Sequence, residues 1–296
     1  MLAPPETPPP PRPPAWAMTL VGGSGADIKA LDAAFAAGAA LSALDVAVRQ
    51  NAPFAGAWRV RLALKAAVAS LEGRAGDETS LRDAFALTRP GGDPGPAGRV
   101  YAAWRALAAG RRLADIAVDL GASPADPEFL NATFDAHARS LAPAPLAAAA
   151  AARAVAAKWP RAIPVAIAVA DGVLAARLGW RAPLPMLALE ALRARPDDAA
   201  WTAACCAAYA RAANRSCDLH AELARAETRL QAVAPKLRAK GAGAALAALL
   251  DDDAVSSATK IAGMSDRGLR RLFDRLVELG AARELTGRPT FRLYGL

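Results

Sequence analysis

The chain has 296 residues, and its 36 lysines and arginines against 28 aspartates and glutamates give a formal net charge of +8. This length exceeds a typical single domain, and the basic balance permits attraction to a polyanion such as a nucleic acid. The three cysteines and two histidines argue against a secreted disulfide scaffold and a zinc site, so we expect a cytoplasmic protein with free thiols and no cofactor.

Residues 1–26 begin with the proline-rich stretch MLAPPETPPPPRPPAW. It lacks a basic start followed by an apolar block, so we predict a disordered lead and not a secretory signal. The most apolar later run, residues 163–176, contains Asp171 and is shorter than the roughly 20 residues that a membrane-spanning helix needs. We therefore expect no membrane segment.

Residues 27–240 predict an all-α body, because apolar residues recur at helical spacing and no alternating strand pattern appears. The first helix, over 28–49, is expected to place Leu31 and Phe35 on its packed face. Asp77 is the predicted N-cap of a short helix that ends near Leu87. Other helices of the body are expected over residues 58–71, from the turn at 89–96 through Tyr101 and Trp104, and over 127–140, 145–159, 163–178, 185–195 and 198–233.

The longest of these helices, over 198–233, carries a seam of apolar and small residues at alternating spacings of three and four. Such a repeat is typical of a coiled coil and could join two chains into a homodimer. The alternative is that the repeat packs on helices of the same body, and the short length of the repeat favours that arrangement. The seam consists of Ala212, Ser216, Leu219, Leu223, Ala226, Leu230 and Val233.

Residues 241–296 have the element order of a winged helix-turn-helix. An apolar helix over 244–250 ends at the triple acid 251–253, and a short second helix is expected over 256–262. A third helix opens at the predicted N-cap Ser265 and stops at Gly280.

Two short extended runs, 282–285 and 291–293, are joined by residues 286–289 and predict a small hairpin. The chain is therefore expected to be mainly α, with a multi-helix body followed by a small C-terminal winged helix-turn-helix that ends in a short β-hairpin.

The third predicted helix and the hairpin carry the candidate DNA contacts, because the apolar stripe of the helix leaves an arginine-rich face free. Guanidinium groups make charge-assisted, often bidentate bonds to phosphate and to guanine, and a helix fits the major groove. We expect Arg267, Arg270 and Arg271 to make the main contacts and the hairpin to contribute further ones. The full set of candidate residues is Ser265, Arg267, Arg270, Arg271, Arg275, Arg288 and Arg292.

These features favour a regulator, transcriptional or plasmid-associated, that binds double-stranded DNA. A homodimer is expected because proteins that read two half-sites are dimers. The alternative is a non-catalytic protein-interaction or dimerisation protein, whose helical body binds a protein partner. The sequence specifies no small-molecule effector.

No catalytic constellation is found, so we do not expect an enzyme. The glycine-rich turn 91–98 has no phosphate-loop lysine and no preceding strand. His220 is interpreted as a solvated surface residue, and His137 has no nucleophile or metal partner in the local sequence.

Three stretches resemble an uncharacterised bacterial family, the domain of unknown function 1403. They are AWRVRLALKAAVASLEGRAGDETSLRDA at 57–84, LTRPGGDPGPAGRVYAAWRALA at 87–108, and the end of the chain from MSDRGLRRLFDRL at 264 onward. The resemblance covers most of the chain after the proline-rich lead and implies no established activity.

A second resemblance links ELTGRPTFRLY, residues 284–294, to the winged helix of Fic-type AMP transferases. Those enzymes carry an HxFx[DE]GNGR motif, whose histidine acts as the base. Neither His137 nor His220 lies in such a motif. The resemblance therefore implies a relative of the Fic scaffold without the transferase activity.

Overall fold

The computed structural model describes residues 11–22, 29–71, 77–86, 88–89, 91–190, 192, 194–286 and 291–296. Over these residues the protein is mainly helical, with one small sheet near the C-terminus. The helices are α1 (Ala15–Thr19), α2 (Ala30–Gln50), α3 (Ala55–Ser70), α4 (Glu78–Ala86), α5 (Gly95–Ala108), α6 (Leu113–Ile116), α7 (Pro127–Ala138), α8 (Ala144–Lys158), α9 (Ile163–Leu178), α10 (Trp201–Val233), α11 (Ala242–Asp251) and α12 (Asp266–Glu278), with short 3₁₀ helices η1 (Leu187–Leu189) and η2 (Ala234–Lys236).

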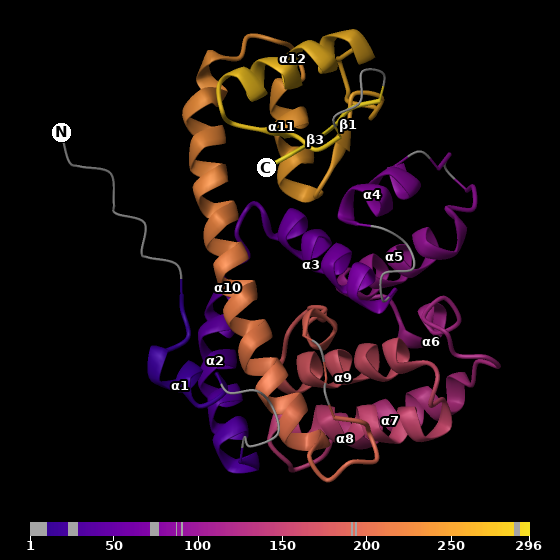
Figure 1. Ribbon diagram of the computed structural model, residues 1–296. Coiled ribbons are helices and arrows are strands. Elements are labelled where there is room, and N and C mark those ends of the chain that lie inside the picture. The colour runs from indigo at the N-terminus through magenta and orange to yellow at the C-terminus, as the bar shows by residue number, and fades with distance from the viewer. Residues whose placement is uncertain are drawn as a thin grey trace.

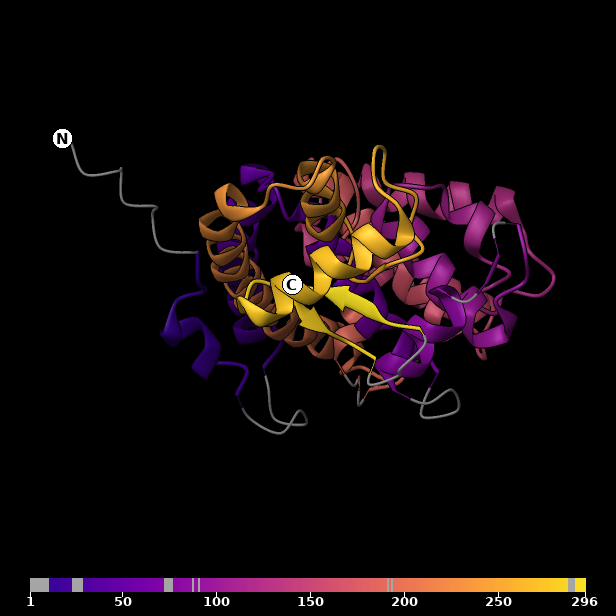
Figure 2. The same ribbon diagram turned by 90° about the horizontal axis from the view of Figure 1, so that it is seen from above.

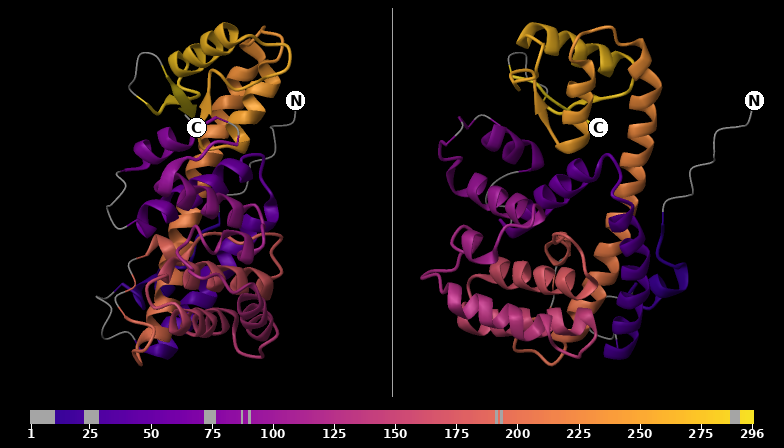
Figure 3. Two further views of the ribbon diagram at one scale, coloured as in Figure 1. Left: turned by 90° about the vertical axis from the view of Figure 1, so that its right-hand side faces the viewer. Right: turned by 180° about the vertical axis from the view of Figure 1, so that it is seen from behind.

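The long helix α10 organises the molecule. Its first half packs beside α2, and it continues to the far end, where α11, α12 and the sheet form a C-terminal unit (Figures 1 and 3). Every residue of the predicted seam, from Ala212 to Val233, is buried within the single chain. The seam is therefore enclosed by the chain's own elements, as its short repeat favours, and the homodimer stays a prediction.

The face of α2 that packs is rich in alanine, and Ala33, Ala36, Ala37 and Ala40 are fully buried. Small side chains allow two helices to approach closely, so that many weak dispersion contacts form along their length. The prediction that Leu31 and Phe35 lie on the packed face is wrong, because they are 80% and 60% exposed.

Helix α2 also corrects the expectation about membrane segments. With 21 residues and a mean hydropathy of 1.6 in its best window, it is long and apolar enough to cross a membrane by length and composition. The many alanines along α2 raise its mean hydropathy. Its alanine-rich face packs against α10.

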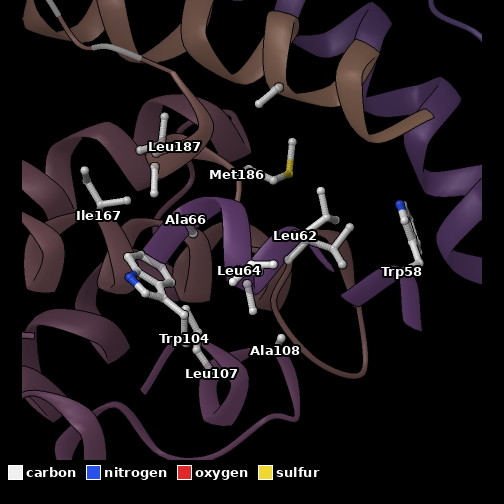
Figure 4. Packing of buried hydrophobic residues seen from close by; sticks show 14 of the residues in the cluster. Trp58, Leu62, Leu64, Ala66, Trp104, Leu107, Ala108, Ile167, Met186 and Leu187 are labelled. Carbon is white, nitrogen blue, oxygen red and sulfur yellow. The ribbon is translucent and has the colours of Figure 1, made fainter. Parts of the chain in front are cut away.

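Tryptophans anchor the core between the helices of the body (Figure 4). Trp58, Trp104 and Trp201 are fully buried, and each indole N–H has an acceptor. Trp58 Nε1 donates to the main-chain oxygen of Ser216 at 3.0 Å, and Trp104 Nε1 donates to Ser70 Oγ at 3.0 Å. These bonds remove the cost of burying a polar group inside an apolar core.

Helix α9 is buried on nearly all sides and contains the acid Asp171, which is 1% exposed. The Asp171 carboxylate accepts hydrogen bonds from the backbone N–H groups of Met186 and Leu187, at 2.8 and 3.3 Å. Burial raises the pKa of Asp171 to about 7, although these two bonds act to lower it.

The predicted helix over 185–195 is wrong. Within the described part of this range only η1 is helical. The backbone becomes extended at Glu190, with φ −122° and ψ 136°, so the helical conformation ends at Leu189.

Other predicted helices are found within a few residues at each end, including 127–140, 145–159, 163–178 and 198–233. Asp77 caps α4, since its Oδ1 accepts the Ser80 N–H at 2.9 Å. The disordered lead predicted over 1–26 is wrong for α1, which buries Ala17 and is followed by the buried Val21. Residues 1–10 and 23–26 of that lead lie outside the described residues.

The sheet consists of β1 (Val255–Ser256), β2 (Arg283–Glu284) and β3 (Leu293–Gly295) in the order β1-β3-β2. Both pairings are antiparallel, with Val255 opposite Tyr294 and Arg283 opposite Gly295. The central strand β3 is fully buried, so the sheet joins the start of the C-terminal unit to its end.

Acids at the end of α11 hold the C-terminal unit on the body. Asp253 is fully buried, and its two oxygens lie 2.6 Å from Arg61 Nε and 2.6 Å from Arg82 Nε. Burial alone would raise the pKa of Asp253, but the charges of Arg61 and Arg82 lower it. Beside it, Arg105 makes a bidentate pair with Asp252 at 2.9 and 2.7 Å.

Candidate nucleic-acid interface

Helix α12 has a residue that caps its start and a glycine that ends it. Ser265 is its N-cap, as predicted, and the Ser265 hydroxyl accepts the Gly268 N–H at 3.2 Å. Gly280 adopts a φ of +67°, a left-handed conformation that glycine reaches without steric cost and that ends the helix. The boundaries of α12 are therefore fixed by its own sequence.

The inner face of α12 packs on the sheet and α11 through Leu269, Leu272, Phe273 and Leu276, all buried. The Phe273 ring lies 4.8 Å from the Tyr294 ring of β3. The outer face points away from the body, and α12 lies at the end of the molecule opposite α7 and α8 (Figures 1 and 2).

Four predicted contacts, Arg267, Arg270, Arg271 and Arg275, are exposed on α12. Arg275 pairs with Glu278 one turn later, at 2.9 Å. Arg267 and Arg271 make no ion pair or hydrogen bond through their side chains to any residue that the structure describes. Their charges are therefore uncompensated in the half of α12 next to its N-terminus.

The side chain of Arg292 is paired with acids of the C-terminal unit. Its Nη1 lies 3.3 Å from Asp274 Oδ1 and 3.5 Å from Glu284 Oε2. A hydrogen bond with Tyr294 and the charge of Glu284 raise its pKa. Arg288 lies outside the described residues.

The predicted second helix over 256–262 is wrong. Val255 is buried and pairs with β3, so the backbone is extended where the helix was expected to open. The Ser256 hydroxyl accepts the Ala258 N–H at 3.1 Å, and the Ser256 carbonyl accepts the Thr259 N–H at 3.0 Å. These local bonds form turns in place of a helix.

Sequence reasoning missed four basic residues outside α12, two of which, Lys240 and Lys260, lie near its start. Lys236, Arg238 and Lys240 are exposed in the connection between α10 and α11, and Lys260 precedes the helix. A Cβ built on Gly263 would lie 3.7 Å from Lys240 Cγ, so the Lys240 side chain runs along the turn before Ser265. Lys260 Nζ lies 3.7 Å from Asp266 Oδ1. The alternating run KLRAK at 236–240 was the available signal.

The interpretation of His220 as a surface residue is wrong. Its ring is buried between Phe54 and Trp58, at centroid distances of 4.8 and 5.1 Å. Neither ring nitrogen has a hydrogen-bond partner among the described residues, and burial lowers the pKa of His220.

The three cysteine thiols lie inside the helical body. Cys205, Cys206 and Cys217 are free and buried, as predicted, and burial raises the pKa of the Cys206 thiol to about 12. Across the described residues, no group of three His, Cys, Asp or Glu side chains could hold a metal ion.

Comparisons with known proteins agree with the resemblance drawn from residues 57–84, 87–108 and 264–296. A search of curated proteins finds no match to this chain. A family model described as protein of unknown function, DUF1403, matches residues 5–296. Because the match extends over nearly the whole sequence, the chain belongs to the DUF1403 family of proteins of unknown function.

Proposed function

We propose that the C-terminal unit is a winged helix-turn-helix that binds double-stranded DNA, and that the protein is a cytoplasmic regulator, transcriptional or plasmid-associated. The element order α11-β1-α12-β2-β3 and the sheet order β1-β3-β2 support this assignment. The expected second helix is replaced by turns between β1 and α12, so the unit is a reduced version of the motif.

The observation that carries the proposal is the outward face of α12. Arg267 and Arg271 are exposed, lie one turn apart and have no partner among the described residues. A helix enters the major groove with the residues of its N-terminal half against the bases and phosphates. Uncompensated guanidinium groups in that half suit such contacts.

The connection between α10 and α11 adds further basic side chains, of which Lys240 runs along the turn before α12. Lys236, Arg238 and Lys240 are exposed and, within the described residues, without an ion pair. Phosphate contacts give affinity and orientation, whereas base contacts give sequence preference. We assign these three residues to the DNA backbone, and the two arginines of α12 to the bases and phosphates that line the groove.

The test is fluorescence anisotropy with pooled duplex fragments from the protein's own genomic neighbourhood, at two salt concentrations. In the double variant R267A/R271A we expect weaker binding and a salt-dependence slope that falls by about one unit per lost phosphate contact. The matched control is R139A/R229A, because both arginines are exposed and neither lies on the C-terminal unit. Equal affinities for both double variants would refute the assignment.

A second candidate function, protein interaction, is favoured by an apolar surface on the other side of the molecule. Trp16 and Phe35 are 53% and 60% exposed and stack with ring centroids 5.4 Å apart, next to the 80% exposed Leu31. Large exposed apolar side chains that cluster mark interaction sites more often than isolated ones do. Wild-type protein that binds no fragment at either salt concentration would make this the leading function.

A further inference from the structure

A small cleft in the body has an unusual charge. It has a volume of about 690 Å³ and lies where the turn between α2 and α3 meets the ends of α5 and α9. Its lining includes Arg49, Arg59 and Arg181, together with Asn51, Gly110 and Trp180. Among the described lining residues none is acidic.

Arg49 is the compensated member of the three. Its Nε lies 2.7 Å from Asp45 Oδ2, and its Nη2 donates to the Leu178 carbonyl at 2.9 Å. Asp45 also accepts the Trp180 Nε1–H at 2.8 Å. This pair leaves no net charge at that wall of the cleft.

Arg59 and Arg181 have no such partner among the described residues. Arg59 is half-buried and donates from Nη1 to the carbonyls of Ala182 and Pro183, at 3.3 and 3.2 Å. Burial and the neighbouring charge of Arg181 lower the pKa of Arg59. Two like charges held together in a partly desolvated cleft favour an anion between them.

The nearby acid on the C-terminal unit does not supply that anion. A Cβ at Gly56 would clash with the Asp251 backbone and with Asp251 Oδ1, so Asp251 covers the start of α3 at one edge of the cleft. Asp251 makes no ion pair with Arg59 or Arg181.

A larger cleft of about 940 Å³, between α3, α4, α10 and β2, serves as an internal comparison. Two of its basic residues are paired with acids of the same lining, Lys65 with Glu78 at 3.0 Å and Arg283 with Glu222 at 3.0 Å. Charges that are satisfied by the protein itself leave little attraction for a ligand. The cleft of Arg59 and Arg181 has no such acid in its described lining.

We infer that the cleft binds a small molecule through a phosphate or pyrophosphate group, held between the guanidinium groups of Arg59 and Arg181. Guanidinium donors match phosphate oxygens in a bidentate arrangement. The volume suits a metabolite-sized ligand. This site goes beyond DNA binding and does not depend on it, because the cleft lies on the body.

The test is isothermal titration calorimetry of the full chain with inorganic pyrophosphate, at an ionic strength kept constant with sodium chloride. Wild-type protein is expected to bind pyrophosphate, and R181Q to bind it about tenfold more weakly or worse, since a charged hydrogen bond is lost. R139Q is the control and should bind like the wild type, because Arg139 is exposed just after α7 and does not line this cleft.

R59Q should weaken binding as R181Q does. Circular dichroism shows whether it folds, and if it does not, R181Q alone decides because Arg181 is exposed. Absence of pyrophosphate binding to the wild type, or equal affinity in R181Q, would overturn the inference. Displacement of pyrophosphate by duplex DNA would overturn it too, because the cleft would then hold a DNA phosphate.

Discussion

At the scale of single residues, Asp171 is the least expected feature of the core. It lies in α9, whose neighbours Val169, Ala170 and Val173 are fully buried, and a carboxylate in such surroundings is strongly disfavoured. Two backbone N–H groups compensate part of that penalty. The rest appears as the rise of the pKa of Asp171 to about 7.

This shift predicts a pH dependence of stability. The pKa of about 7 in the folded state lies above the ordinary aspartate value of 3.8, so the folded state holds a proton that the unfolded state releases between these two values. The contribution of Asp171 is therefore fully present below pH 3.8 and is lost as the pH rises through 7. His220 acts in the opposite direction, because its lowered pKa removes stability as the pH falls below 6.5.

The D171N variant separates the two effects, since His220 is unchanged in it. We expect the free energy of unfolding of the wild type, relative to D171N, to fall by about 1 kcal/mol per pH unit between pH 5 and 7. Urea denaturation at pH 5, 6, 7 and 8 measures this difference. A difference that is flat over this range would show that the Asp171 carboxyl does not titrate there.

At the scale of elements, the position of α10 bears on the two interpretations of its apolar seam, packing within the chain and dimerisation. A coiled-coil repeat reports that a helix has an apolar stripe, and it does not report whether the stripe faces another chain or its own. In this protein Leu223 and Leu230 are buried within one chain. Helix α10 runs from the body to the C-terminal unit and connects them (Figure 1).

The substitution L223A tests this assignment. Removal of a fully buried leucine side chain is expected to lower the free energy of unfolding by about 2–5 kcal/mol, because it leaves a cavity. The loss should be independent of protein concentration between micromolar and hundreds of micromolar. A loss that grows on dilution would mean that the seam joins two chains. The control is R229A, because Arg229 is exposed, and it should change the free energy of unfolding little.

Elements that carry their own signals could be predicted from the sequence. Pro127, Pro145 and Pro164 lie in the first turns of α7, α8 and α9, where proline is tolerated, and Ser265 and Gly280 bound α12. Of the two predicted helices that are absent, the one over 256–262 failed because Val255 and Ser256 pair with Tyr294 and Leu293, which are distant in sequence. In the other, periodicity over 185–195 does not report that the backbone becomes extended at Glu190.

The candidate nucleic-acid interface also has a part that could be predicted from the sequence and a part that could not. The exposed face of α12 follows from helical periodicity, so the exposure of Arg267 and Arg271 could be predicted. The pairing of Arg292 with Asp274 and Glu284 depends on how α12 and two strands are brought together, which periodicity does not specify. The same holds for Arg59 and Arg181, which are adjacent only because α3 meets the segment after α9.

At the scale of the whole molecule, the triple acid 251–253 has a structural role. Asp252 and Asp253 reach three arginines from three different helices, Arg105 on α5, Arg61 on α3 and Arg82 on α4. Arg61 also donates from Nη2 to the main-chain oxygen of Leu296 at 3.0 Å, so one side chain contacts both ends of the C-terminal unit. The unit is therefore held in a defined orientation, with α12 facing outward.

The substitution D253N is expected to destabilise this junction. It leaves Arg61, whose side chain is 7% exposed, without its carboxylate partner, and leaves Arg82, 10% exposed, with Glu78 alone. Breaking a buried ion pair from one side costs about 3–5 kcal/mol, because the remaining charge stays desolvated. Urea denaturation followed by circular dichroism measures the loss.

The matched control is D218N, because the Asp218 side chain is 52% exposed and its ion pair with Arg12 is 4.0 Å long. We expect it to change the free energy of unfolding by about 0.5 kcal/mol or less. If D253N changed stability as little as D218N, the other polar contacts, Arg82 with Glu78, Arg61 with the Leu296 oxygen and Arg105 with Asp252, would suffice to hold the junction. A large loss with D253N would instead mean that the charge of this one aspartate stabilises the junction between the body and the C-terminal unit.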